Sequence, residues 1–181
     1  SPAKGPELMR ILFCNYEYPP LGGGGGVFTA ALAEELARRH EVTVLTSQGL
    51  GLPAEETIRG VRVVRVPVFL RRRQAVANLP SLAAYVLMGV PAGKRLLRAR
   101  AFDVINTHFA LPTGPVGDAL SRWGRVPNVL TLVGGDVYDP SKWTSPHRHP
   151  WLRAQVRRLV RRADGVIGSS ANVQGYLEQY Y

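Results

Sequence analysis

Short apolar runs alternate with longer amphipathic segments along most of the chain. Aliphatic and β-branched residues form six short runs, at 10–15, 42–46, 61–66, 104–107, 128–133 and 165–168. Runs of this length, bounded by polar or glycine-containing segments, are typical of buried strands. We therefore expect six strands.

Segments with apolar residues at helical spacing separate these strands. They cover 27–39, 79–100, 114–123, 151–162 and 173–180. Gly89 and Pro91 interrupt the second of them, so we expect a kink or two helices there. The segment 48–59 contains glycine and proline, and we expect it to be a loop.

The alternation of strands and helices predicts an α/β fold, a Rossmann-like, doubly wound parallel sheet with right-handed connections. No repeat or linker divides the chain, so we expect 9–181 to form one domain and 1–8 to be a tag remnant or a disordered extension. Ligands of such sheets bind at the carboxyl ends of the strands. The candidate site therefore lies in the loops that follow those ends.

A run of five glycines, from Gly22 to Gly26, lies between the first predicted strand and the first predicted helix. Open backbone N–H groups beside the positive end of a helix dipole favour an anion such as phosphate. The alternative is a flexible surface loop, but the position of the run favours an anion site. Val27 stands where the dinucleotide fingerprint needs a third glycine, and no Gly-Lys-Ser/Thr follows, so neither a dinucleotide-binding motif nor a P-loop is expected.

Two polar side chains follow other strands. His108 can hydrogen-bond a substrate hydroxyl or transfer a proton, or it can cap the next turn. Asp136 can accept hydrogen bonds from hydroxyls, or cap its own turn. His147 and His149 supply too few ligands for a metal site, so we expect no metal.

The formal net charge of +10 implies anionic partners, either nucleotide phosphates, nucleic acid or an anionic membrane. Arg71, Arg72 and Arg73 form one basic patch, which is either solvated or in contact with lipid head groups. No aromatic stacking platform or known motif accompanies the charge, so we expect no nucleic-acid partner. The single cysteine, Cys14, excludes an internal disulfide and suits a cytoplasmic protein.

These motifs together resemble the N-terminal domain of retaining glycosyltransferases of the family 4 type, which have the GT-B fold. The resemblance covers nearly all of 9–181. It rests on Tyr18-Pro19-Pro20, then Gly22-Gly23, then His40-Glu41-Val42-Thr43-Val44, on the strand that ends at His108, and on the segment 163–170. Gly134 departs from the family, which often has a histidine there. The second, donor-binding domain of the family, with its paired glutamates, is expected to be absent from this chain.

The resemblance implies transfer of a sugar from a nucleotide-sugar, such as a UDP- or GDP-sugar, with retention and without a metal or other cofactor. It gives His108 a contact with the donor sugar, and Gly22, Gly23 and Gly24 a contact with the donor diphosphate and the acceptor. Tyr18, Asp136 and Tyr138 are expected to line the acceptor pocket.

The expected partners are the donor, a sugar, lipid-linked or small-molecule acceptor, the second domain and an anionic membrane surface. The expected location is therefore cytoplasmic, at the inner face of the membrane. The glycine loop is expected to be long and poorly ordered. The alternative function is a stand-alone Rossmann-like module that binds a nucleotide or another anion without catalysis.

Overall fold

A seven-stranded sheet forms the centre of the part of the chain that the structure, a computed structural model, describes. That part comprises residues 7–49, 51–68, 79–143 and 145–181. The elements in chain order are β1 (Arg10–Cys14), α1 (Gly24–Ala37), β2 (Glu41–Ser47), β3 (Glu55–Ile58), β4 (Val61–Val66), α2 (Leu79–Ala99), β5 (Val104–His108), α3 (Gly114–Gly124), β6 (Asn128–Leu132), the 3-10 helix η1 (Pro146–Arg148), α4 (Pro150–Arg162), β7 (Gly165–Gly168) and α5 (Ala171–Tyr180).

The strand order is β3-β4-β2-β1-β5-β6-β7. Every neighbouring pair except β3 and β4 is parallel. Without β3, this is the strand order of the doubly wound Rossmann fold, so the predicted fold class is confirmed. The order reverses between β1 and β5, where a crevice opens outside their carboxyl ends.

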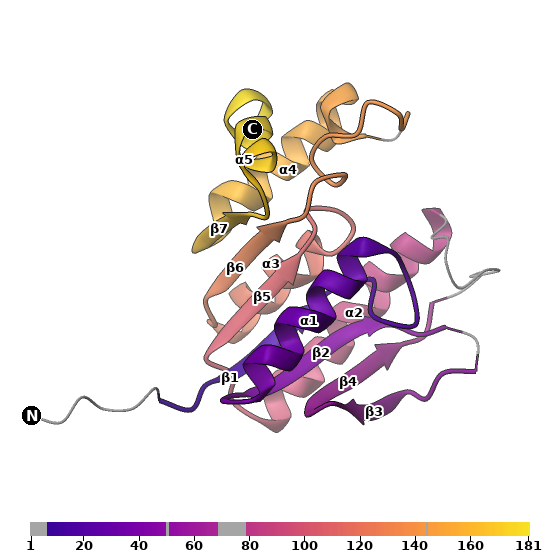
Figure 1. Cartoon of the computed structure of the whole chain (residues 1–181), viewed down its shortest axis with the longest axis vertical. Coiled ribbons are helices and arrows are strands. Elements are labelled where there is room, and N and C mark those ends of the chain that lie inside the picture. Colours follow the sequence, from indigo (N-terminus) through magenta and orange to yellow (C-terminus); the bar gives the residue numbers. More distant parts are fainter. Residues whose placement is uncertain (1–6, 50, 69–78, 144) are drawn as a thin grey trace, which may run out of the picture.

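The helices cover both faces of the sheet because its strands are apolar on both sides. Phe13, Val44 and Val63 face α1, which lies in front of the sheet in Figure 1. Leu12 and Leu45, one position away on β1 and β2, face α2 and α3 behind it. Successive side chains of a strand point to opposite faces of the sheet, so the same strands contribute residues to the core on each face.

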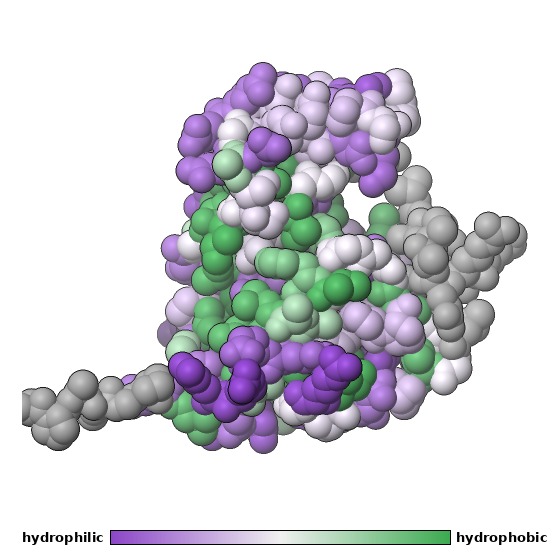
Figure 2. All heavy atoms as spheres, in the orientation of Figure 1, coloured by the Kyte–Doolittle hydropathy of each residue, from purple (hydrophilic) through white to green (hydrophobic). Residues whose placement is uncertain are grey.

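Cys14 lies at the end of β1 inside the second of these cores and has no exposed surface. Burial raises the pKa of its thiol to about 12. A third core joins β6 to α4 and α5 through Leu130, Val156 and Val173. In Figure 2 the most hydrophilic residues gather at the lower end of the molecule, and apolar residues cover its middle.

The prediction of a loop over 48–59 was wrong at Glu55–Ile58, which form the edge strand β3 and pair antiparallel with β4. Arg59 and Gly60 turn the chain with φ of 46° and 83°. Such a pair of left-handed residues matches the twist of a tight hairpin. Arg-Gly is a weak hairpin signal, and the strand itself is polar, so the sequence pattern did not reveal it.

Two predictions about helices also need correction. α1 begins at Gly24, not at Val27, so three of the five glycines are helical and the loop before them is shorter than expected. α2 continues through Pro91 as one helix, so the alternative of two helices was wrong. Within the described residues, no helix is long and apolar enough to cross a membrane. Arg71, Arg72, Arg73 and most of the segment 1–8 lie outside the described residues.

Candidate functional site

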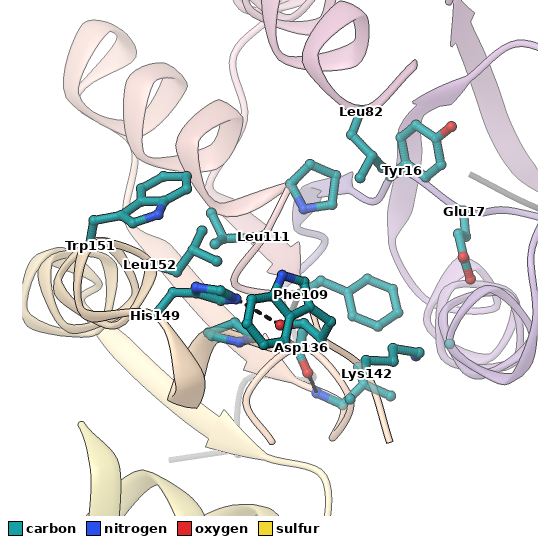
Figure 3. A pocket seen from close by; sticks show the side chains of 16 residues that line it. Tyr16, Glu17, Leu82, Phe109, Leu111, Asp136, Lys142, His149, Trp151 and Leu152 are labelled. Atoms are coloured by element: carbon teal, nitrogen blue, oxygen red, sulfur yellow. Dashed lines mark hydrogen bonds between the residues drawn. The ribbon is translucent and has the colours of Figure 1, made fainter. Parts of the chain in front are cut away.

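A groove of about 740 Å³ lies outside the carboxyl ends of β1, β5 and β6. Tyr16 and Glu17 from the loop after β1 form one wall, as Figure 3 shows. Phe109 and Leu111 follow β5, and Trp151 comes from α4. The groove therefore lies at the reversal of strand order, among the loops at the carboxyl ends of the strands in which the sequence analysis expects the candidate site.

The glycines of the predicted anion site open onto solvent at the start of α1. Gly23 is the N-cap residue and has no side chain of its own to cap the helix. A Cβ atom on Gly23 or Gly24 would meet no atom within 4 Å. Gly22, with φ of 90°, makes the turn that leads into the helix. These residues leave room for an anion beside the positive end of the helix dipole.

A carboxylate of the protein itself already lies at this helix end. The Gly23 N–H donates to Oε2 of Glu17 over 3.1 Å. A Cβ atom on Gly22 would lie 2.6 Å from the same oxygen, so only glycine leaves the space that the Glu17 side chain fills. Sequence reasoning missed Glu17, because its role depends on the chain doubling back over six residues.

His108 is fully buried and is held by a hydrogen-bond hub on α1. Its Nδ1 lies 2.7 Å from Oγ1 of Thr29. That hydroxyl donates to the Gly25 carbonyl over 2.9 Å and accepts from Nδ2 of Asn15 over 2.5 Å. All three side chains of this hub, His108, Thr29 and Asn15, have no exposed surface.

The hub assigns the tautomer of the imidazole. The geometry of the Thr29 hydroxyl fits a hydrogen bond to the Gly25 carbonyl, so its single proton is assigned to that bond. Nδ1 of His108 then carries the proton that Thr29 accepts, and Nε2 keeps a lone pair. Nε2 is buried and has no partner among the described residues. Burial lowers the pKa of His108 to about 4, so the ring is neutral at pH 7 and Nε2 can accept a hydrogen bond.

Phe109 follows His108 in a conformation that few bulky residues adopt, with φ of 74°. Its ring packs on Gly25, where a Cβ atom would lie 2.0 Å from Cζ of the ring. The glycine run therefore has a second use, which is to let this ring approach the first turn of α1. Left-handed backbone at a bulky residue is common beside functional sites.

Asp136 is 8% exposed and ties the carboxyl ends of β5 and β6 together. Its carboxylate accepts hydrogen bonds from the backbone N–H groups of Ala110, Val133 and Gly134, at 2.8, 3.1 and 2.8 Å. Burial raises its pKa, and the hydrogen bonds oppose that shift. Asp136 lines the groove, but its oxygens are largely used by the protein.

The two predicted acceptor-pocket tyrosines lie away from the groove lining. Tyr18 is 1% exposed in the core under α1, so a contact with an acceptor would require its side chain to leave that core. Tyr138 stacks on Tyr176 of α5 at 4.3 Å between ring centroids, and its ring lies 4.5 Å from that of His147 in a tilted arrangement. No group of three or more metal-ligating side chains occurs within the described ranges, and the expectation of a metal-free reaction stays a prediction.

Comparison with known proteins gives a consistent picture. A family model described as Glycosyltransferase Family 4 matches residues 22–181. Glycogen synthase of Mycobacterium tuberculosis is 29% identical over 189 residues, which cover 96% of this chain. An uncharacterized glycosyltransferase of Methanocaldococcus jannaschii is 26% identical over 133 residues, 72% of this chain.

Among solved structures, sucrose-phosphate synthase from Thermosynechococcus elongatus matches 95% of the chain with a TM-score of 0.73 and 20% identity. At that identity the likeness concerns the fold alone. The chain spans less than half the length of these proteins, at 45% of the glycogen synthase, 33% of the archaeal protein and 45% of the sucrose-phosphate synthase chain.

Proposed function

This chain belongs to Glycosyltransferase Family 4, and on that premise we propose that it is the acceptor-binding half of a retaining glycosyltransferase with a nucleotide-sugar donor. The observation that carries the proposal is the buried, neutral His108, whose Nε2 is left without a partner by the described residues. A fixed acceptor atom at a strand end, beside a glycine-rich helix N-terminus, suits a sugar hydroxyl next to a diphosphate.

The start of α1 stabilises the leaving group. Charge develops on the donor diphosphate as the bond to the anomeric carbon breaks. The space beside Gly23 and Gly24 and the helix dipole favour that negative charge once the Glu17 carboxylate gives up the Gly23 N–H. A second domain holds the nucleotide, which is a UDP or GDP group, on the opposite side of the cleft.

His108 orients the donor sugar. The Nδ1–H donates to Thr29, so Nε2 accepts a hydrogen bond from a sugar hydroxyl and holds the ring in place. A neutral ring with a pKa of about 4 donates no proton at pH 7, so its role is orientation and not acid catalysis. Phe28, 39% exposed with its ring 5.5 Å from the imidazole, turns aside to admit the sugar.

The transfer itself retains the anomeric configuration. The bond between the anomeric carbon and the diphosphate oxygen breaks, and the acceptor oxygen bonds to the same face of that carbon. The proton of the acceptor hydroxyl passes to the departing diphosphate. This scheme needs no metal.

The net charge of +10 supports a cytoplasmic protein that docks on the inner face of the membrane, where anionic lipid attracts basic residues. If co-sedimentation of the protein with vesicles depended on neither the anionic lipid content nor the salt concentration, the docking proposal would be rejected.

The test is transfer from UDP- and GDP-sugars by the protein as its gene encodes it. We expect His108→Ala to lower kcat/KM by about tenfold or more, the effect of losing one well-placed hydrogen bond. His40→Ala is the matched control, because His40 lies just before β2, at the amino ends of the strands and away from the groove at their carboxyl ends. Unchanged kcat/KM in the His108 variant of an active enzyme would refute the role of this residue.

A further inference from the structure

We propose that the groove binds an acceptor through an apolar aglycone, an alkyl or aromatic group that carries the sugar or hydroxyl to be modified. This inference rests on the proposed function and names the acceptor class of its site. It starts from two indoles, Trp143 and Trp151, which line the groove with 75% and 67% of their surface exposed.

The groove offers a ligand mainly apolar surface. Phe109, Leu111 and Leu152 line it together with the two indoles. Figure 3 shows the side chains of these three residues and of Trp151 around one hollow. Exposed large apolar side chains that gather in one place mark binding sites, whereas scattered ones are ordinary. The volume of about 740 Å³ falls in the usual range for small-molecule sites.

The charged side chains of the groove already have partners. Glu17 accepts from the Gly23 N–H, and Asp136 accepts from three backbone N–H groups. Lys142 pairs with Asp139 at 3.0 Å. A bare saccharide needs many side-chain hydrogen bonds to replace its water, and this groove provides few that are not in use. An apolar aglycone needs none, and it gains from each buried CH₂ group.

The groove is continuous with the donor side of the site. Gly25 lines it, and the Gly25 carbonyl accepts from Thr29, which also holds His108. An aglycone lying along Trp151 and Phe109 would therefore present its hydroxyl near the sugar that His108 orients. A basic helix adjoins the same wall, because Arg157, Arg158 and Arg161 are exposed on α4 beyond Trp151.

The test uses two glucosides that differ only in the aglycone, titrated into this 181-residue chain. They are octyl β-D-glucopyranoside, below its critical micelle concentration, and methyl β-D-glucopyranoside. The chain contains three tryptophans, so Trp123→Phe leaves only the two groove indoles as fluorescent reporters. We expect saturable emission changes with the octyl glucoside and a Kd at least about tenfold lower than that of the methyl glucoside.

A complementary reporter controls for detergent binding elsewhere. Trp143→Phe with Trp151→Phe keeps Trp123, which is 41% exposed on α3 outside the groove lining. Its emission should not respond. Trp151→Ala in the Trp123→Phe background should weaken octyl glucoside binding about fivefold or more. Calorimetric titration of the unmodified chain with both glucosides gives the same comparison without any variant.

Equal affinity for the two glucosides, or an equal response from the Trp123 reporter, would overturn the proposal. A transfer assay separates this failure from failure of the proposed function. An active enzyme that prefers bare saccharides overturns the aglycone inference alone. Tight octyl glucoside binding by a protein that transfers no sugar overturns the function and leaves the apolar site.

Discussion

At the scale of single residues, the hub around His108 gives the site its defined chemistry. A buried imidazole whose pKa has fallen from 6.5 to about 4 stays neutral throughout the physiological range. Its hydrogen-bonding role is therefore set by Thr29 and Asn15, two buried residues on other elements. The sequence marked His108 by its place at a strand end, but nothing in the pattern marked its two partners.

The lowered pKa predicts how stability depends on pH. Below pH 6.5 the unfolded chain protonates this imidazole, but the folded chain does so only near pH 4. The free energy of unfolding should therefore fall as the pH drops from about 6.5 to 4, with about 3 kcal/mol from this residue. Urea denaturation of the unmodified chain and of the His108→Gln variant, each at pH 7 and 4.5, isolates the contribution of His108. If the free energy of unfolding fell equally in the two proteins between these pH values, the prediction would be wrong.

From the position of Glu17 we predict that its carboxylate competes with a bound anion at the start of α1. If a diphosphate binds beside Gly23, it must share the space with the Glu17 carboxylate, and like charges repel. Glu17→Gln should therefore strengthen binding of inorganic pyrophosphate to this chain by about threefold or more, measured by calorimetric titration.

Glu35→Gln is the matched control for this competition. It removes the same charge from the carboxyl half of α1, where Glu35 pairs with Arg38 at the surface. If both variants bound pyrophosphate equally more tightly, the change in net charge would account for the effect. If Glu17→Gln bound pyrophosphate no more tightly than the unmodified chain, the diphosphate site would lie elsewhere.

At the scale of elements, the glycine run is part of a helix that packs against a ring. Gly24 and Gly25 are adjacent, yet a Cβ atom meets nothing at the first and the ring of Phe109 at the second. Gly25→Ala should lower the free energy of unfolding by about 1–3 kcal/mol, because the ring has to move. Gly24→Ala should be neutral or raise it by up to about 0.5 kcal/mol, since alanine favours helix. Urea denaturation measures the free energy of unfolding of both variants, and equal values for the two would contradict this prediction.

The elements also show where sequence patterns fail. The helices and inner strands follow their apolar periodicity, since most of their stability comes from burying one face or both. β3 lacks that signal because its stability comes from pairing with β4 and from the ion pair between Glu56 and Arg65 at 2.5 Å. The start of α1 was misjudged because glycine disfavours helix, whereas here the close approach of Phe109 requires it.

At the scale of the whole molecule, the alternation of elements was enough to predict the six parallel strands of the sheet, at whose carboxyl ends the groove lies. The residues that line this groove come from segments far apart in sequence, such as the loops that carry Glu17 and Phe109 and the helix α4 that carries Trp151. Only the strand order brings them together, and no local pattern records it. For the same reason the sequence could not show that Tyr18 and Tyr138 lie away from the groove lining. They follow β1 and β6, two of the strands that end at the groove, but Tyr18 packs in the core under α1 and Tyr138 stacks on α5.

The burial of Cys14 has a practical consequence for studies of this protein. Its thiol has no exposed surface, and its pKa of about 12 leaves almost no thiolate at neutral pH. The thiolate is the nucleophile that attacks thiol reagents, so the folded chain is effectively inert toward them. A cysteine introduced at Ser141, next to Lys142 of the groove lining, would then be the sole site to accept a spin label or a dye. That label could report ligand binding in the groove without first removing the native residue.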